Sequence, residues 1–378
     1  MIKILHVISD TNIGGAGVHL CNLLACADRT QFDVTVVIPQ GSALIPRIAV
    51  LDIPTVTIRH GADRSADLRA VPELIAVIRR IHPHILHTHS ALYARIAGWL
   101  CRVPVAVNTR HCADMTAPTA PKTRLAVGFS EHLLNTHTIA TAHYVKGILV
   151  KQGHRPQEVT VIHNGSLPVP RLTDAEKKQI RAELGIEDGA FVIGIVARLA
   201  EGKGHETFLR AAKLCLDEAS NLRFLIVGNG EKEGELKTMA QELGIADQVR
   251  FLGFRTDVGR IMNILAINVN CSRRSETSSL SLSEGMCVGA VPVVTDCGGN
   301  PFMAGLGACG FVFPVENADR LAEVLLSLSR DKTRLATLSA SCQRHFSTHF
   351  TAEGMTTKTE LLYKTLLQAA TTSPKIAK

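Results

Sequence analysis

Short runs of apolar, β-branched residues alternate with longer helix-like segments along the whole chain of 378 residues. This alternation is typical of β/α units, in which parallel strands form a sheet that helices cover on both faces. It occurs as two series, which together predict two Rossmann-like domains. The strands expected are residues 2–8, 34–38, 55–58, 85–87, 103–107 and 159–162 in the first series, and 191–196, 224–227, 249–252, 266–269 and 291–294 in the second.

The two series are separated by residues 163–170, a stretch that contains Gly and two Pro and interrupts both periodicities. Such a stretch predicts an interdomain linker. Just beyond it, Thr173 and Glu176 have the spacing of a capping box, which predicts the start of a helix that runs to about Leu184. The segments expected are a domain at 1–168, a domain at 169–355, and a helix at 356–378 that packs back on the first domain and ends in a frayed tail.

The composition, 46% hydrophobic and 20% charged, excludes a disordered chain. No stretch approaches the roughly 18 uncharged apolar residues of a membrane span, so we expect a cytoplasmic protein. The ten cysteines include no C-x-x-C pair and are expected to be reduced, small hydrophobic residues rather than disulfides or zinc ligands.

The net charge of +7 is unevenly distributed. Residues 1–170 contain 16 Lys and Arg against 10 Asp and Glu, and the remainder contains 25 against 24. No dense cationic cluster with interleaved aromatic residues occurs, so we expect no nucleic-acid partner. The basic first half instead suggests contact with an anionic partner.

A glycine-rich loop follows the first expected strand and includes Gly14 and Gly15. Glycines let a backbone approach a ligand closely, and the amide groups at a helix start attract phosphate. The loop lacks the G-x-G-x-x-G spacing, and the second strand ends in Ile38-Pro39-Gln40 without an acidic residue to hold a ribose. This disfavours a dinucleotide-dependent dehydrogenase.

Two cations, Arg198 and Lys203, follow the first strand of the second series. Loops at the carboxyl ends of parallel strands form the crevice in which such sheets bind ligands. Two cations there can neutralise a departing diphosphate when no metal does so. The alternative is an ordinary pair of surface charges.

Two carboxylates eight residues apart, Glu276 and Glu284, enclose a run of small hydroxyl residues. This pattern predicts Glu276 on the loop after a strand and Glu284 inside the next helix. Ser278 and Ser279 then lie at the helix start, where capping groups and free amides can meet phosphate oxygens. A carboxylate on a rigid helix can accept both hydroxyls of a ribose. The alternative is a Ser-rich helix start with a solvated glutamate pair.

Taken together, these motifs resemble the retaining glycosyltransferases of the GT-B fold, glycosyltransferase family four. The resemblance covers essentially the full length and depends on the order and spacing of its parts. These are the Gly-Gly-Ala loop at 14–16, Pro-x-Ile-x-His-x-His at 83–89, the Asn-Gly linker at 164–165, Arg-x4-Lys at 198–203, Val-Gly-x-Gly at 227–230, Phe-Leu-Gly at 251–253, and E-x7-E at 276–284 followed by Pro-Val-Val-x-Asp-x-Gly-Gly at 292–299. It implies an α/β fold of two Rossmann-like domains that face each other across a cleft.

The resemblance also implies the site residues. The catalytic residues implied are Glu276, His111, Arg198 and Lys203. The donor-binding residues implied are Gly14, Gly15, Arg198, Lys203, Gly253, Phe254, Ser278, Ser279, Leu280 and Glu284, with Gly253 and Phe254 in the loop that meets the base. Arg198 and Lys203 neutralise the leaving diphosphate, Glu284 holds the ribose, Glu276 contacts the transferred sugar, and His111 lies near its reacting carbon.

The implied reaction transfers a sugar from a nucleotide-sugar donor with retained anomeric configuration. UDP is the nucleotide that family frequency favours, and the leaving phosphate itself takes the acceptor's proton. No cofactor and no metal are expected. The acceptor expected is a glycan or a lipid-linked precursor in polysaccharide or cell-envelope biosynthesis, with peripheral contact to an anionic inner membrane face. The alternatives are a nucleotide-sugar epimerase or phosphorylase of the same fold, and a non-catalytic nucleotide-sugar-binding subunit.

Three residues depart from the family pattern. Thr277 follows the first glutamate where Gly is common, Cys112 follows His111 where Gly is common, and Phe302 lies where many members have Glu. They leave donor preference open and are the reason for keeping a non-catalytic alternative.

Three further segments have two interpretations each. Residues 113–122 and the apolar helical pattern at 124–135 predict a loop and a core-facing helix, or a mobile acceptor flap. The basic helix predicted at 67–81 presents a solvated face or a membrane-surface patch. Alternating His82, His84, His87 and His89 suit a strand end, or a zinc site, which we disfavour.

Overall fold

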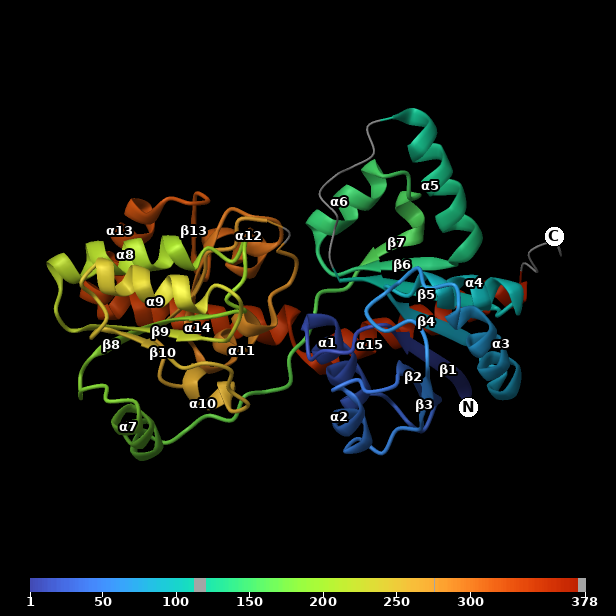
Figure 1. Ribbon diagram of the computed structural model, residues 1–378, viewed down its shortest axis with the longest axis horizontal. Coiled ribbons are helices and arrows are strands. Elements are labelled where there is room, and N and C mark those ends of the chain that lie inside the picture. The colour runs from blue at the N-terminus through green and yellow to red at the C-terminus, as the bar shows by residue number, and fades with distance from the viewer. Residues whose placement is uncertain (112–119, 275, 373–378) are drawn as a thin grey trace. The chain divides into compact units, whose positions relative to one another are not determined.

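The computed structural model describes residues 1–111, 120–274 and 276–372 (Figure 1). The chain divides into two compact units. We call Met1–Gly165 together with Ala352–Lys378 the N-terminal unit, and Ser166–Thr351 the C-terminal unit. Each has its own parallel sheet and its own core, and each is described separately below.

The N-terminal unit contains a seven-stranded parallel sheet in the order β3-β2-β1-β4-β5-β6-β7. Its strands are β1 (Ile2–Ile8), β2 (Phe32–Pro39), β3 (Thr55–Ile58), β4 (Ile85–His89), β5 (Val105–Arg110), β6 (His137–Ala140) and β7 (Val159–Val161). Its helices are α1 (Gly15–Ala25), α2 (Ile45–Ala49), α3 (Ala70–Ile81), α4 (Leu92–Leu100), α5 (Pro121–Leu134), α6 (His143–Lys151), the short 3₁₀ helix η1 (Pro156–Glu158) and α15 (Ala352–Thr372).

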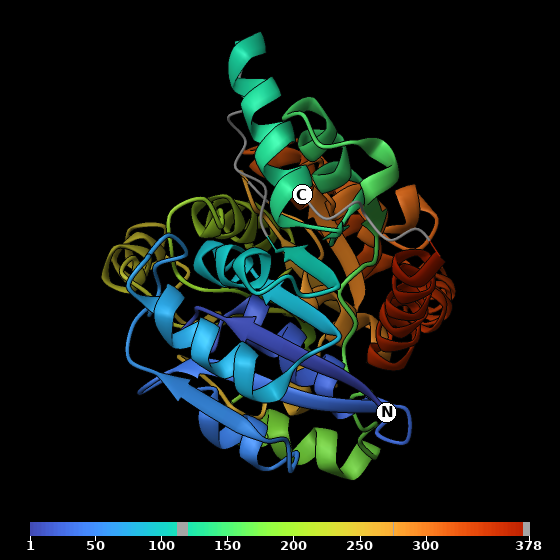
Figure 2. The ribbon, with the colours of Figure 1, turned by 90° about the vertical axis from the view of Figure 1, so that its right-hand side faces the viewer.

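Helices cover both faces of this sheet, as burial of a parallel sheet requires. Apolar side chains of α1, α2 and α15 pack against one face, and those of α3 and α4 against the other. Figure 2 shows helices as ribbons on either side of this sheet. The last helix, α15, is anchored by polar contacts as well. The carboxylate of Glu360 accepts a hydrogen bond from the Asp28 backbone N–H at 2.8 Å, and the buried Tyr363 hydroxyl contacts His87 Nδ1.

The C-terminal unit contains a six-stranded parallel sheet in the order β10-β9-β8-β11-β12-β13. Its strands are β8 (Phe191–Val196), β9 (Leu222–Val227), β10 (Val249–Phe251), β11 (Ile267–Asn270), β12 (Val291–Thr295) and β13 (Phe311–Phe313). Its helices are α7 (Asp174–Glu183), α8 (His205–Glu218), α9 (Glu233–Glu242), α10 (Val258–Met262), α11 (Leu280–Val288), α12 (Asn300–Met303), the short 3₁₀ helix η2 (Gly305–Gly307), α13 (Ala318–Arg330) and α14 (Lys332–His349).

The predicted capping box at the start of α7 is confirmed. The Thr173 side chain accepts from the Glu176 backbone N–H, while the Glu176 carboxylate accepts from the Thr173 backbone N–H at 2.7 Å. The largest cluster of buried apolar side chains lies between the sheet and helices α8, α9 and α13. Two further clusters contain side chains of α7 and α10, and of α11 and α14.

The prediction of a core-facing helix at 124–135 is wrong. Leu125 and Phe129 of α5 are 77% and 68% exposed, and Leu133 is 43% exposed. No residue of α5 is fully buried, and one of its part-buried side chains, Glu131, forms a 2.7 Å ion pair with the buried Arg95 of α4. The loop predicted before α5 lies largely outside the described residues, as does Cys112.

The basic helix predicted at 67–81 exposes its arginines, which fits both a solvated face and a membrane-surface patch. In α3, Leu74 and Ile78 are buried, whereas Arg79 and Arg80 are exposed. Arg69 forms an ion pair with Asp67. Among the helices that the structure describes, none combines the length and the apolar character needed to cross a bilayer.

Candidate active site

A buried carboxylate, Glu276, lies at the carboxyl ends of β11 and β12 in the C-terminal unit and is only 8% exposed. Its Oε2 atom accepts three hydrogen bonds. They come from Lys203 Nζ at 2.9 Å, Ser272 Oγ at 2.7 Å and Asn270 Nδ2 at 3.3 Å. The structure thus brings Lys203 and Glu276 together, although 73 residues separate them in the sequence.

The amide of Asn270, the last residue of β11, has a fixed orientation. Its Oδ1 accepts hydrogen bonds from the Ser272 backbone N–H at 3.0 Å and from Asn300 Nδ2 at 3.3 Å. The Asn300 amide also donates to Thr295 Oγ1 at 3.1 Å. Because Oδ1 of Asn270 is held on that side, its NH₂ group is presented to Glu276.

A glycine turn after β12 supports the backbone of Glu276. Gly298 has φ of +59°, and a Cβ there would lie 2.0 Å from the Glu276 carbonyl oxygen. The next amide, Gly299 N–H, donates to that same oxygen at 3.0 Å. Only glycine fits so close an approach at positive φ, which accounts physically for the first glycine of the Gly-Gly pair.

Glu276 stays ionised despite its burial. Burial by itself raises the pKa of this carboxyl, but the charge of Lys203 and the hydrogen bonds from Ser272, Lys203 and Asn270 outweigh it. The pKa therefore lies below its ordinary value. The site holds a fixed carboxylate that can accept hydrogen bonds from hydroxyl groups of a ligand.

The loop that carries Lys203 is pinned to the segment after β11. The Arg273 backbone N–H donates to Gly202 O at 2.8 Å, and a Cβ on Gly204 would lie 2.0 Å from Cys271 O. The Arg273 guanidinium also pairs with Glu206 of α8 at 2.9 Å. These contacts hold the ammonium group of Lys203 beside Glu276.

Arg198 differs from Lys203. It follows β8 on the same loop, is exposed, and forms no ion pair with a residue that the structure describes. Its guanidinium is thus accessible to an anion from solvent. The structure pairs Lys203 with a carboxylate and leaves Arg198 solvated.

Glu284 lies in α11, on the helix expected from the sequence. Burial raises the pKa of Glu284 to about 7, and no described cation offsets that effect. At the start of the helix, Ser279 is the N-cap and accepts a hydrogen bond from the Leu282 backbone N–H at 3.4 Å. Leu280 is the first helical residue, and Ser278 precedes the cap and is buried.

Two glycine turns lie side by side at the ends of β9 and β10. The Gly228 backbone N–H donates to Gly253 O at 2.8 Å, and Gly253 has φ of +63°. The next side chain, Phe254, is 60% exposed. An exposed aromatic ring on a fixed turn can stack on a nucleotide base.

In the N-terminal unit, Gly14 is the N-cap of α1 and Gly15 its first residue. A Cβ at either glycine would meet no described atom within 4 Å, so the surface above this helix start is open. The backbone amides there point away from the helix and can receive an anion.

His111 follows β5 and belongs to a group of packed rings that we call the histidine cluster. The cluster consists of His6, His19, His87, His89 and His111. The His89 and His111 rings stack at 5.3 Å, with His89 Nδ1 and His111 Nε2 3.0 Å apart. Burial lowers the pKa of His6 to about 3 and that of His19 to about 4, so these rings are neutral.

The cluster differs from the set of four histidines considered in the sequence, His82, His84, His87 and His89. His82 caps the C-terminus of α3, and His84 Nδ1 accepts a hydrogen bond from the Lys3 backbone N–H at 2.9 Å. Only His87 and His89 of that set join the cluster. His6 joins the cluster because it is in register with His87 on the neighbouring strand. The sequence alone could not predict this neighbour, because the pairing of the strands has to be known first.

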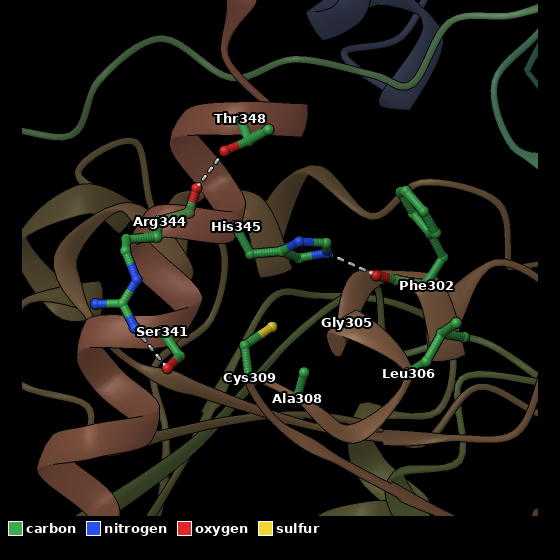
Figure 3. A pocket seen from close by; sticks show the side chains of 9 residues that line it. All are labelled: Phe302, Gly305, Leu306, Ala308, Cys309, Ser341, Arg344, His345 and Thr348. Atoms are coloured by element: carbon green, nitrogen blue, oxygen red, sulfur yellow. Dashed lines mark hydrogen bonds between the residues drawn. The ribbon is translucent and has the colours of Figure 1, made fainter.

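A separate hollow of about 410 Å³ lies in the C-terminal unit between α12, η2 and α14 (Figure 3). Its lining residues are Phe302, Gly305, Leu306, Ala308, Cys309, Ser341, Arg344, His345 and Thr348. The Phe302 ring packs against the rings of His345, His349 and Phe350, and its carbonyl contacts His345 Nε2 at 2.8 Å. Phe302, which departs from the family pattern, is therefore a packing residue here.

Comparison with known families assigns each half of the chain. Residues 13–166 match the family described as Glycosyltransferase Family 4, and residues 176–344 match Glycosyl transferases group 1. The chain thus contains one segment that is similar to each of these two glycosyltransferase families.

The relatives of this chain include D-inositol 3-phosphate glycosyltransferases. The protein of Rhodococcus opacus is 28% identical over 304 residues, which cover 72% of this chain and 66% of the relative. The protein of Catenulispora acidiphila is 24% identical over 367 residues, which cover 88% of this chain and 86% of the relative. The match therefore spans just under two thirds of the Rhodococcus relative.

Solved structures support the fold. HepE of Anabaena, crystallised with UDP, superposes with a TM-score of 0.84 at 19% identity, covering 96% of this chain and all of that one. A glycosyltransferase of Rickettsia africae gives a TM-score of 0.83 at 18% identity, covering 97% and 99%. The fold is GT-B, as the sequence predicted.

Proposed function

We propose that the protein is a retaining glycosyltransferase that moves a sugar from a nucleotide-sugar donor to a glycan or lipid-linked acceptor in polysaccharide or cell-envelope biosynthesis. The observation that carries this proposal is the Glu276 site. A carboxylate is kept ionised by Lys203 and two buried hydrogen-bond donors, at the edge of a parallel sheet where such folds bind ligands. The glycosyltransferase domains support the same class of reaction.

In the proposed reaction the donor binds through its two ends. Glu284 and the ring of Phe254 receive the nucleoside, while the start of α11 and the glycines at the start of α1 face the phosphates. A UDP-sugar is the donor that we favour, and crystals of the structural neighbour HepE with UDP and with UDP-glucose support that choice.

The chemistry that we assign needs no cofactor and no metal. Glu276 accepts hydrogen bonds from the transferred sugar and fixes its orientation, and we assign His111 to the region of its reacting carbon. Lys203 and Arg198 stabilise charge on the diphosphate as the glycosidic bond breaks. The acceptor hydroxyl attacks the face from which the diphosphate leaves, and a phosphate oxygen takes its proton, so the configuration is retained.

An anionic membrane surface is the setting that we propose for the acceptor. The exposed side chains of α5, Leu125, Phe129 and Leu133, lie within one stripe of that helix, with Lys122 and Arg124 exposed beside them. An apolar stripe flanked by cations suits the interface of an anionic bilayer. The basic excess of the first half of the chain favours the same partner.

The test is a screen of nucleotide sugars, first for binding and then for transfer. We expect Glu276→Gln and Lys203→Met to lower turnover at least 100-fold while the circular dichroism spectrum is unchanged. Lys237→Met is the matched control. Among the described residues, the only ion-pair partner of Lys237 is Glu233, which lies one helical turn away on the surface. Equal turnover in all four proteins would contradict the proposal.

The same screen separates the alternatives. Incubation with donor alone changes the sugar itself if the protein is an epimerase, because that reaction needs no acceptor. Tight nucleotide-sugar binding without turnover on any acceptor identifies a non-catalytic binding subunit. The proposed transferase instead consumes donor in proportion to added acceptor.

A further inference from the structure

Three residues of the histidine cluster are arranged as ligands to a single ion. His19 of α1, His89 at the end of β4 and His111 after β5 each offer one ring nitrogen, and these nitrogens lie within 4.8 Å of one another. His19 and His89 are 2% or less exposed, and His111 is half-buried. Three elements of one unit therefore converge on one point.

The spacing suits a transition metal. Zinc binds histidine nitrogens at about 2.0–2.1 Å, which places two ligands of a tetrahedral ion about 3.3 Å apart. His89 Nδ1 and His111 Nε2 are already 3.0 Å apart. Small ring rotations are enough to admit an ion between them and His19.

The hydrogen bond of His19 fixes which of its nitrogens can bind. His19 Nδ1 lies 2.9 Å from Asn164 Oδ1. An amide oxygen only accepts, so Nδ1 carries the hydrogen, and in a neutral ring the lone pair is on Nε2. A ligand histidine whose other nitrogen donates to an oxygen is the usual arrangement at metal centres.

His89 has an equivalent support. Its Nε2 lies 3.2 Å from His6 Nδ1, so with Nδ1 on an ion, Nε2–H donates to the buried His6 ring. The other possible trio, His6, His87 and His89, is less suitable. Both ring nitrogens of His87 are already engaged, one by Tyr363 and the other by Thr109 Oγ1 at 2.7 Å.

We propose that His19, His89 and His111 bind one divalent transition-metal ion, of which Zn²⁺ suits the three imidazoles best, and that the bound ion inhibits sugar transfer. Mg²⁺ and Ca²⁺ are not expected, because they prefer oxygen ligands. Inhibition follows because an ion on His111 withdraws that ring from the reacting sugar. This second part rests on the proposed function, whereas metal binding does not.

The binding test is titration of the full chain with Co²⁺, followed by its visible absorption. We expect one equivalent to bind with the intense bands of low-coordinate Co²⁺, and His19→Gln and His111→Gln each to weaken binding at least tenfold. The control is His349→Gln, which breaks a close pair of histidine rings outside the cluster, His345 and His349 of α14 at 4.7 Å. That variant keeps the bands.

Two results would overturn the metal site. One is the absence of bands at millimolar Co²⁺, and the other is equal affinity in wild type, His19→Gln and His111→Gln. Circular dichroism shows whether each variant is folded. If loss of the His19–Asn164 hydrogen bond unfolds His19→Gln, the Co²⁺ affinity of His111→Gln is compared with that of the wild type instead, because His111 is only half-buried.

The inhibition test compares each protein with its own zinc-free rate. We expect stoichiometric Zn²⁺ to stop transfer by wild type and by His349→Gln, a chelator to restore it, and His19→Gln to be insensitive. Undiminished transfer by the zinc-loaded wild type would overturn the inhibitory role. Co²⁺ binding at this site without transfer in any assay would contradict the proposed function and leave the metal site supported.

Discussion

At the scale of residues, Glu276 and Glu284 carry the same group in opposite surroundings. Lys203 and two hydrogen-bond donors keep Glu276 ionised, whereas burial without a cation raises the pKa of Glu284 to about 7. The two carboxyls of one E-x7-E pattern are therefore suited to different tasks. Glu276 is charged at any physiological pH, and Glu284 changes charge near neutrality.

This difference predicts a pH dependence of donor binding. In the role that we propose, the ionised Glu284 accepts both ribose hydroxyls and the protonated form does not. Donor affinity is then expected to fall about tenfold between pH 8 and pH 6 for a pKa near 7. Calorimetric titration with UDP at a series of pH values measures it. Glu284→Gln should bind weakly at every pH, and a wild-type affinity that is flat across this range would argue against the assigned role.

The same residue has the opposite effect on stability. Because the folded-state pKa is raised, the contribution of the protonated carboxyl is fully present below about pH 4.5 and is lost as the pH rises through 7. Glu284→Gln should therefore raise the melting temperature at pH 8 and leave it unchanged at pH 4. Equal shifts at both pH values would show that burial does not cause the raised pKa.

Gly298 offers a second residue-level test. Alanine there has unfavourable positive φ and a Cβ 2.0 Å from Glu276 O, so we expect a loss of about 1–3 kcal/mol in the free energy of unfolding. Displacement of Glu276 should also lower transfer more than tenfold. Gly307→Ala is the control, with φ of +96° but open space around the Cβ. An equal loss of activity in Gly298→Ala and Gly307→Ala would show that the contact with Glu276 is not the cause of the loss.

The sequence predicted some of these residues and missed others for a physical reason. Glu276 and Lys203 belong to local motifs, which spacing reveals. Asn270, Ser272 and Asn300 belong to no motif and become partners of Glu276 only when β11, β12 and α12 meet. Only Asn270 has a local signal, an amide at the end of an apolar strand, and that signal is ambiguous without the tertiary contact.

At the scale of elements, strands with a clear apolar run were predicted, and β6 and β13 were missed. β6 is His-Thr-Ile-Ala and β13 is Phe-Val-Phe, both too short or too polar to show a period. They become strands because a neighbouring strand offers a free edge. Helix α5 is the converse case, because its apolar spacing is real but Leu125 and Phe129 are exposed.

The exposed stripe of α5 leads to an element-level prediction. Phe129→Glu should weaken binding to vesicles of phosphatidylcholine and phosphatidylglycerol at least fivefold, because it removes the ring and adds a repelled charge. Leu361→Glu is the matched control, an exposed leucine on α15. Cosedimentation measures both. Equal binding by both variants, or no vesicle binding by the wild type at low salt, would remove α5 as the membrane contact.

At the scale of the whole molecule, two parallel sheets in series follow from periodicity alone, because a sheet buried on both faces demands apolar strands. The histidine cluster does not follow from it. His6, His19 and His111 are far apart in the sequence, and α1, β1, β4 and β5 bring them together. Local patterns thus predict elements, while the convergence of polar groups on one point depends on how those elements pack.

The central claim is retaining sugar transfer that depends on Glu276. Its most direct test is proton NMR of the product formed from an α-linked nucleotide sugar and an accepted glycan, with wild type and Glu276→Gln compared. We predict an α-linked product from the wild type and a rate at least 100-fold lower from the variant. A β-linked product, or an equal rate in the variant, would contradict the account.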